Sequence, residues 1–168
     1  MRKLLVGVVA GAVIVLAAEF LFVTQGGMPV SAQGGPLPLE RLIAGRALHV
    51  AVAKEAALPS PVPADTPNLL AGARVYREQC MVCHGSLGER EPPPFARGMF
   101  PHPPQLLPPE EGVTDDPVGE THWKVHNGIR LTGMPGFQGV LSDAAEWQVS
   151  QLLHGADKLP DEVQAMLK

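Results

Sequence analysis

Both cysteines of the chain lie in one short stretch, CMVCHG, at residues 80–85. Cys80 and Cys83 are three positions apart, and His84 comes directly after the second cysteine. On a helical turn, positions i and i+3 share one face, so both thiols can reach the same edge of one bound group while the histidine projects inward. Two cysteines cannot form the disulfide framework that stabilises small secreted folds, so ligation or reactivity must explain them.

This spacing is the attachment signature of c-type haem, in which two thiols add to the vinyl groups and the adjacent histidine ligates iron. We therefore expect one haem c, bound covalently through Cys80 and Cys83, with His84 as an iron ligand. A zinc site would usually require a second pair of cysteines, which the chain lacks, although scattered histidines could complete one. A thioredoxin-like redox pair would need a preceding strand in a βαβ setting, and the sequence shows no such pattern.

An apolar run at residues 4–23 comes after Arg2 and Lys3. A helix that spans a bilayer needs roughly 20 such residues, so we predict that residues 1–24 form a transmembrane anchor or an uncleaved signal. A signal peptide cleaved after the small residues 30–32 is the alternative. The basic residues hold the N-terminus in the cytoplasm, which places the rest of the chain on the periplasmic side of the cytoplasmic membrane. Cleavage would leave the protein in the periplasm.

Residues 25–64 are interpreted as a spacer that carries one amphipathic helix and ends in a proline-rich linker. Apolar residues recur at helical spacing from Leu39 to about Ala57, and Pro38 suits the first turn of such a helix. Its apolar stripe could lie on the bilayer surface, against a partner subunit or on the chain's own domain. The linker, PSPVPADTP, marks the start of the working domain at residues 65–168.

The working domain is predicted to be all-α, with three main helices. Thr66 is the expected cap of the first helix, which runs into the cysteine motif with a proline in its first turn. The second helix is expected from residues 116–117 to Gly128, and the third from residues 142–143 to Gly155. Between the first two helices, nine prolines in residues 91–117 exclude regular helix or central strand. So long a loop needs a bound group to hold it in place.

The sixth position on iron requires a second ligand, and methionine is the first candidate. Apart from Met1 and Met81, the chain has Met28, Met99, Met134 and Met166. Met134 lies in NGIRLTGMPGF, where Gly and Pro set an irregular backbone that can aim one side chain inward, so we predict Met134 as the ligand. Core packing is the ordinary role of a methionine. Bis-histidine ligation through His126 is the alternative for the iron.

These segments together resemble class I cytochrome c, in particular the single-haem bacterial domains related to those of cbb3 oxidases. The resemblance covers about residues 68–155, through NLLAGARVYREQCMVCHG, PPQL, GMPGF and LSDAAEWQVSQLL. It implies a cytochrome c fold in which about three helices wrap one haem, with Gly72 and Tyr76 where the first helix crosses the last. It also implies that the Pro104 carbonyl accepts the Nδ1 hydrogen of His84. The stretch EREPPPFARGMFPHP is longer than the family's small members carry.

Four further side chains on or near the second helix are candidates for binding. Trp123 and Arg130 could contact haem propionates, whereas core packing and a solvated surface charge are their alternative roles. His122 and His126 are spaced i, i+4, which can bind a metal ion, but no carboxylate lies at a matching spacing. The other histidines are expected to be exposed: His49, His102 and His154.

The charge distribution indicates the kind of partner. The formal net charge is −4, and residues 65–168 hold fourteen acidic residues against eight Lys and Arg. Nucleic acid is therefore excluded as a partner, and a redox protein with a basic rim at the membrane is favoured. An acidic surface also serves solubility alone.

Three functions fit the sequence. The first is a membrane-anchored carrier of single electrons between respiratory or dehydrogenase partners, with no small-molecule substrate. The second is a cytochrome subunit of a larger membrane redox complex. The third is a peroxidase-like or gas-binding haem protein, which would require Met134 to be absent from the iron. No hydrolytic constellation surrounds Ser142, so we predict no catalytic residues.

Overall fold

The computed structural model describes residues 1–107 and 112–168. Within these residues the chain is helical, with no strand and a single isolated bridge between Gln138 and Leu141. Contacts divide the chain into two compact units, Met1–Leu37 and Pro38–Lys168. The predicted all-α class is confirmed.

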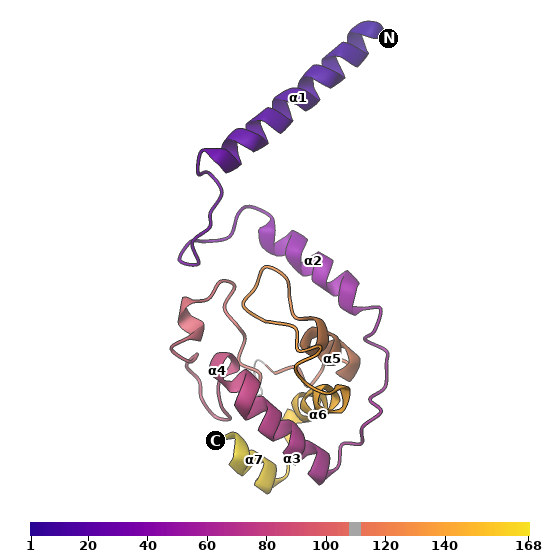
Figure 1. Ribbon diagram of the computed structural model, residues 1–168, viewed down its shortest axis with the longest axis vertical. Helices are drawn as coiled ribbons and strands as arrows, with labels where there is room; N and C mark the ends of the chain where they lie inside the picture. The colour runs from indigo at the N-terminus through magenta and orange to yellow at the C-terminus, as the bar shows by residue number, and fades with distance from the viewer. Residues whose placement is uncertain (108–111) are drawn as a thin grey trace. The chain divides into compact units, whose positions relative to one another are not determined.

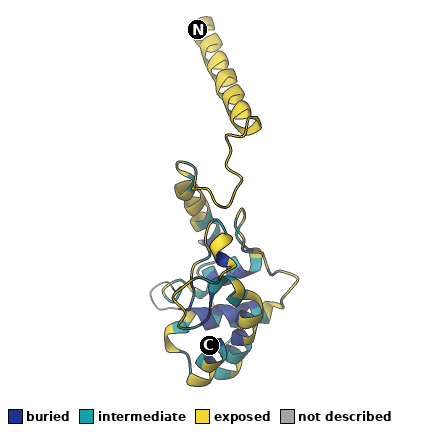
Figure 2. Cartoon of the chain, turned by 90° about the vertical axis from the view of Figure 1, so that its left-hand side faces the viewer, coloured by how far each residue is buried: buried dark blue, intermediate teal, exposed yellow. Residues whose placement is uncertain are grey.

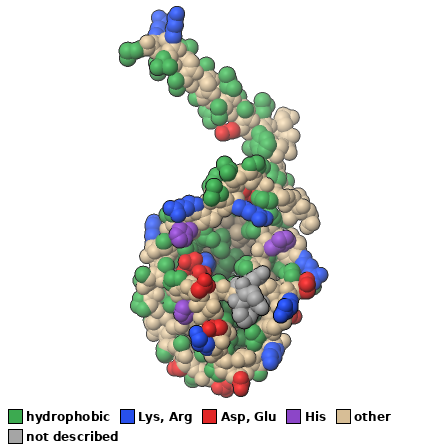
Figure 3. Space-filling view, turned by 180° about the vertical axis from the view of Figure 1, so that it is seen from behind, with side chains coloured by type: hydrophobic (Ala, Val, Ile, Leu, Met, Phe, Trp, Pro, Cys, Tyr) green, Lys and Arg blue, Asp and Glu red, His purple; other side chains and the backbone are tan. Residues whose placement is uncertain are grey.

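The first unit contains one helix, α1 (Arg2–Thr24). All of its side chains are exposed, and hydrophobic groups cover it along its length (Figures 2 and 3). By length and composition the helix could cross a membrane, a test that a signal sequence also passes. The anchor and signal interpretations of this segment are therefore both compatible with α1.

The second unit is a small helical domain (Figure 1). Helix α3 packs against α6 and α7, α5 packs against α6, and α2 contacts α5. Apolar side chains of α3, α6 and α7 form the core, which Figure 2 shows as the buried centre of this unit. The bounds are α2 (Glu40–Val52), α3 (Thr66–Val75), α5 (Val118–Asn127), α6 (Asp143–His154) and α7 (Asp161–Leu167).

The crossing of α3 and α6 depends on a glycine. A Cβ at Gly72 would overlap the backbone carbonyl of Gln148 on α6, so only glycine allows this approach. One turn later, the fully buried ring of Tyr76 packs into the same core. The small and aromatic positions that the resemblance implied therefore lie at the predicted crossing.

The helix ends agree with the capping signals of the sequence, with one correction. Asp65, and not Thr66, is the N-cap of α3, because its extended backbone lets the carboxylate accept from the Asn68 N–H at 3.1 Å. Ser142 caps α6 through the Ala145 N–H, and Gly128, with φ of 68°, ends α5 as predicted.

The spacer helix is shorter than predicted. It begins at Glu40, because Leu39 has φ of 67° and cannot belong to it, and it ends at Val52 instead of about residue 57. Val52 is buried, and the backbone carbonyls of Glu55 and Ala56 lie where a Cβ on Gly119 of α5 would be. The end of α2 and the segment after it therefore pack on α5 within the second unit, so the chain's own domain is the one of the three expected places that this structure contains.

A short C-terminal helix was not predicted. In α7, Val163 and Leu167 are fully buried one turn apart, and the Leu167 carbonyl accepts from the Leu87 N–H at 2.9 Å. Two buried positions in a seven-residue helix are too weak a periodic signal for sequence analysis, and only the contact with α3 makes them core.

Candidate functional site

The helix that delivers the cysteines changes its winding just before them. After α3, residues Tyr76–Cys80 form a π-helical turn, and α4 (Met81–His84) resumes the α-helix up to Gly85. The Met81 N–H accordingly reaches back to the Tyr76 carbonyl. Such a turn inserts one extra residue and rotates the side chains after it, and it is frequent at functional sites.

A cavity of about 300 Å³ lies beside this motif. Cys80, Cys83 and His84 line it from one segment, and Met134 lines it from a segment far away in the sequence. The remaining lining is mainly apolar and comes from the proline-rich loop, α5 and the residues after α5. Concave apolar cavities with a few convergent polar groups are the usual form of a cofactor site.

One ring nitrogen of His84 is held by the proline-rich loop. Its Nδ1–H donates to the Pro104 carbonyl at 2.7 Å, the hydrogen bond that the family resemblance implied. Burial lowers the pKa of His84, while the bond to Pro104 opposes the shift. The ring is therefore kept neutral with Nε2 as its free acceptor, which is the state that ligates a metal.

Burial affects two groups of this segment, Tyr76 and Cys80. The Tyr76 hydroxyl donates to the Gly85 carbonyl at 2.8 Å, and burial raises its pKa, so it stays a donor at physiological pH. Burial, with a smaller contribution from Cys83, raises the pKa of the Cys80 thiol to about 12. Tyr76 thus fixes the end of α4 directly after His84.

The loop that carries Met134, residues 128–141, is held by hydrogen bonds and not by helix. The Thr132 hydroxyl donates to the Ile129 carbonyl at 2.7 Å and accepts from the Met134 N–H at 3.1 Å. The Ile129 N–H in turn donates to the Met134 carbonyl at 3.2 Å. These bonds close a tight turn around Met134, and Thr132 is a supporting residue that sequence analysis missed.

The domain that holds this cavity matches one protein family. The sequence profile of the family described as "Cytochrome C oxidase, cbb3-type, subunit III" matches residues 67–153. The chain belongs to this family. It therefore contains a cytochrome c domain, whose chemistry is electron transfer by haem.

Similarity to individual proteins is weaker. No curated protein matches the chain. Among solved structures, a chain of the reducing HAO-like protein complex of Kuenenia stuttgartiensis is similar, with 22% identity and a TM-score of 0.49. The similarity covers 60% of this chain and 48% of that one, so this chain spans about half the length of that protein.

The residues of the cytochrome c domain fit a haem in kind and in place. The paired thiols, the neutral histidine and a methionine sulfur all border one apolar cavity, and these are the ligand types that c-type haem uses. Met99 borders the same cavity and is a second sulfur there. Leu48 of α2 also lines it, although the sequence pattern had indicated no role for α2 in the site.

Three other candidate residues lie outside the cavity lining: Trp123, Arg130 and His126. Neither Trp123, which is half-buried, nor Arg130, which is exposed, belongs to the cavity lining. Contact of either with a propionate therefore stays a prediction. His126 is also outside the lining, and its Nδ1–H donates to the Glu146 carboxylate of α6 at 2.7 Å.

Proposed function

We propose that the chain is a membrane-anchored, single-haem c-type cytochrome that carries single electrons. Cys80 and Cys83 would hold the haem covalently, and His84 and Met134 would ligate its iron. The observation that carries this proposal is that all four residues border one cavity while Pro104 occupies the other nitrogen of His84. Bound haem supplies a metal centre that gains and loses one electron.

The protein's own residues prepare the site for that role. The Pro104 carbonyl orients the His84 ring and raises the basicity of its free nitrogen. Two protein ligands leave no open position for a substrate, which favours transfer of electrons over catalysis. Methionine ligation would raise the reduction potential of a bound haem relative to bis-histidine ligation. The apolar lining would raise it too, because a low-dielectric surrounding disfavours the more highly charged oxidised state.

The domain organisation is part of the same proposal. Residues 1–24 would be the membrane anchor, residues 25–64 the spacer with α2, and residues 65–168 the haem domain on the periplasmic side. The acidic surface of the haem domain favours redox partners with a basic rim, in a respiratory or dehydrogenase pathway. A place as the cytochrome subunit of a larger membrane complex is the second candidate, supported by the family match to an oxidase subunit.

The test is the visible spectrum of the full-length protein, produced with haem-attachment machinery. The oxidised protein should show the weak far-red band of iron bound to methionine sulfur, and the reduced protein should not bind carbon monoxide. Met134→Ala should lose the band and gain carbon monoxide binding. Met99→Ala is the matched control, because this second sulfur borders the same cavity, and it should keep both wild-type properties.

Two outcomes would contradict the proposal. Loss of the band in Met99→Ala alone would move the ligand to Met99. Carbon monoxide binding by the wild-type protein would favour the gas-binding or peroxidase-like function. Purification in mild detergent then separates the two remaining functions, since a complex subunit would retain stoichiometric partner proteins and a carrier would not.

A further inference from the structure

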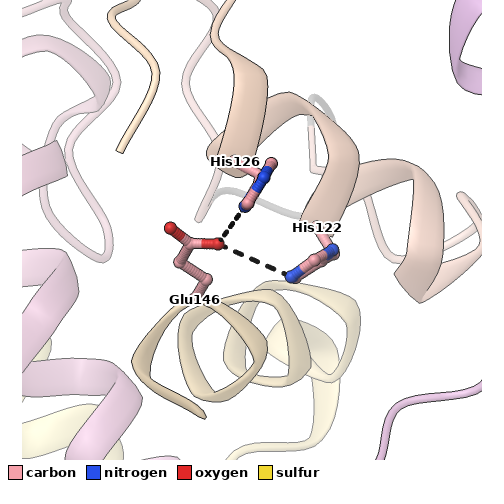
Figure 4. A group of neighbouring side chains, drawn as sticks. All are labelled: His122, His126 and Glu146. Carbon is pink, nitrogen blue, oxygen red and sulfur yellow. Dashed lines mark hydrogen bonds and ion pairs between the residues drawn. The ribbon is translucent and has the colours of Figure 1, made fainter. Parts of the chain in front are cut away.

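A second cluster of polar side chains lies between α5 and α6, apart from the haem cavity. His122 and His126 extend from successive turns of α5 toward Glu146 on α6 (Figure 4). The Glu146 Oε2 atom is 2.7 Å from His126 Nδ1 and 3.6 Å from His122 Nε2. None of the three residues lines the cavity that holds the cysteine motif.

The burial of this cluster is unusual for charged groups. The side chain of Glu146 is 1% exposed and that of His122 is 10% exposed. Neither ring nitrogen of His122 has a hydrogen-bond partner among the residues that the structure describes. A buried polar group normally finds a partner, because leaving it unpaired is costly, so the unpaired nitrogens of His122 are available to a ligand.

A second carboxylate lies on the open side of the cluster. Asp143, in the first turn of α6, has its Oδ1 atom 3.6 Å from His122 Nε2, and its side chain is 73% exposed. Asp143 and Glu146 are spaced i, i+3 and so share one face of α6. Two imidazoles from α5 thus meet two carboxylates from α6.

The distances suit a small transition-metal ion. Zinc binds imidazole nitrogen and carboxylate oxygen at about 2.0–2.2 Å in a tetrahedron, which places ligand atoms roughly 3.4 Å apart. The two 3.6 Å separations around His122 Nε2 are close to this value. The donor atoms of His122, His126 and Glu146 all lie within 4.8 Å of one another.

Packing already orients one of the two histidine rings. The His122 ring stacks on Trp147 of α6, with centroids 3.8 Å apart and planes 8° apart. A ring held in this way loses little conformational freedom on binding. The proton that His126 shares with Glu146 is the one that a metal ion would replace.

We propose that His122, His126 and Glu146 form a binding site for a divalent transition-metal ion such as zinc, with the exposed Asp143 next to His122 at its edge. The ion would cross-link α5 to the first turn of α6. Nitrogen and oxygen donors without thiolate favour zinc, copper or nickel over calcium or magnesium. The site does not depend on the ligands of the haem iron.

The test uses the full-length, haem-loaded protein in detergent, purified without a polyhistidine tag and treated with a chelator. Titration with zinc sulfate, monitored by calorimetry and by metal analysis after dialysis, should give one zinc ion per chain. His126→Gln and Glu146→Gln should each weaken binding at least about tenfold. His49→Gln is the matched control, since this exposed histidine on α2 is outside the cluster, and it should bind zinc like the wild type.

Two outcomes would contradict the proposed zinc site. Absence of stoichiometric zinc binding by the wild type would show that the cluster is only an ion pair. Unchanged binding in both variants, or weakened binding in His49→Gln, would place the zinc elsewhere. An unaltered haem spectrum in all variants shows that they are folded. Because Met134 and His84 are untouched, failure here leaves the proposed electron-transfer function intact.

Discussion

The motif segment, residues 76–85, and the methionine loop, residues 128–141, meet at the same cavity by different means. The motif segment is helical, and most of its hydrogen bonds run between residues a few positions apart. The methionine loop is irregular, and it is anchored on another element: Phe137 and Gln138 donate to the carbonyls of Val125 and His126 at 3.0 and 3.2 Å. Local sequence thus shapes one side of the cavity, and contact with α5 shapes the other.

The close approach of the loop to α5 shows how specific that contact is. A Cβ at Gly128 would overlap main-chain atoms of Pro135 and Gly136, and a Cβ at Gly136 would press on Asn127. Glycines at both positions let the two backbones touch. Changes in the motif segment should therefore affect attachment of the haem, whereas changes in the methionine loop should affect ligation and stability.

The largest effect is expected from the motif segment. The double replacement Cys80→Ser and Cys83→Ser removes both thiols, so covalent haem should be lost completely, as measured by haem staining after denaturing electrophoresis. Val82→Ala, at the exposed position between them, is the control and should keep the stain. Covalent haem in the double variant would contradict the assignment of these thiols.

Met134→Ala should leave covalent haem in place but weaken the fold. Truncating this partly buried side chain removes core contacts and the proposed iron ligand, so we expect the free energy of unfolding to fall by on the order of 2 kcal/mol or more. Denaturant unfolding of the haem-loaded protein measures this loss. If Met134→Ala also lost the haem stain, the methionine loop would be needed for haem attachment as well, and the two segments would not differ in this respect.

Gly72→Ala tests whether the motif segment also depends on tertiary contact. The added methyl group would overlap the Gln148 carbonyl, so α3 must shift from α6, at a cost of about 1–3 kcal/mol in unfolding free energy. Gly45→Ala on α2 meets no atom within 4 Å and should be neutral or stabilising. If haem attachment fell as well, the motif segment would be less autonomous than its helical structure suggests.

The smallest effect is expected at Thr132. Thr132→Val keeps the shape of the side chain but removes both hydrogen bonds of its hydroxyl, so stability should fall by about 1 kcal/mol. The far-red band should weaken in parallel, because Met134 is held less firmly. Thr114→Val, the same change outside the methionine loop, is the control. A full-strength band in Thr132→Val would show that the loop is positioned by α5 alone.

The sequence predicted those parts of the fold that have local signals. The predicted end of α5 at Gly128 and the predicted start of α6 at Ser142 are correct. A residue with positive φ and a side-chain cap both act within one turn, so the local sequence shows them. The cap of α3 was misplaced by one residue, because Asp65 and Thr66 are both good caps. Helix α7 was missed, because its two core residues become informative only when α3 covers them.

For the candidate sites, too, features with a local sequence signal were predicted and features that depend on tertiary contact were not. The sequence by itself determined the family, the all-α class and the cysteine motif, because these depend on residue types and their spacing within short segments of the chain. Only the tertiary structure decided that Leu48 and Met99 border the cavity and that Glu146 faces His122 and His126. Leu48 lies on α2, Met99 in the proline-rich loop and Glu146 on α6. Contacts between elements, such as those of α5 with α6 and α2, place such residues, and no local spacing encodes these contacts.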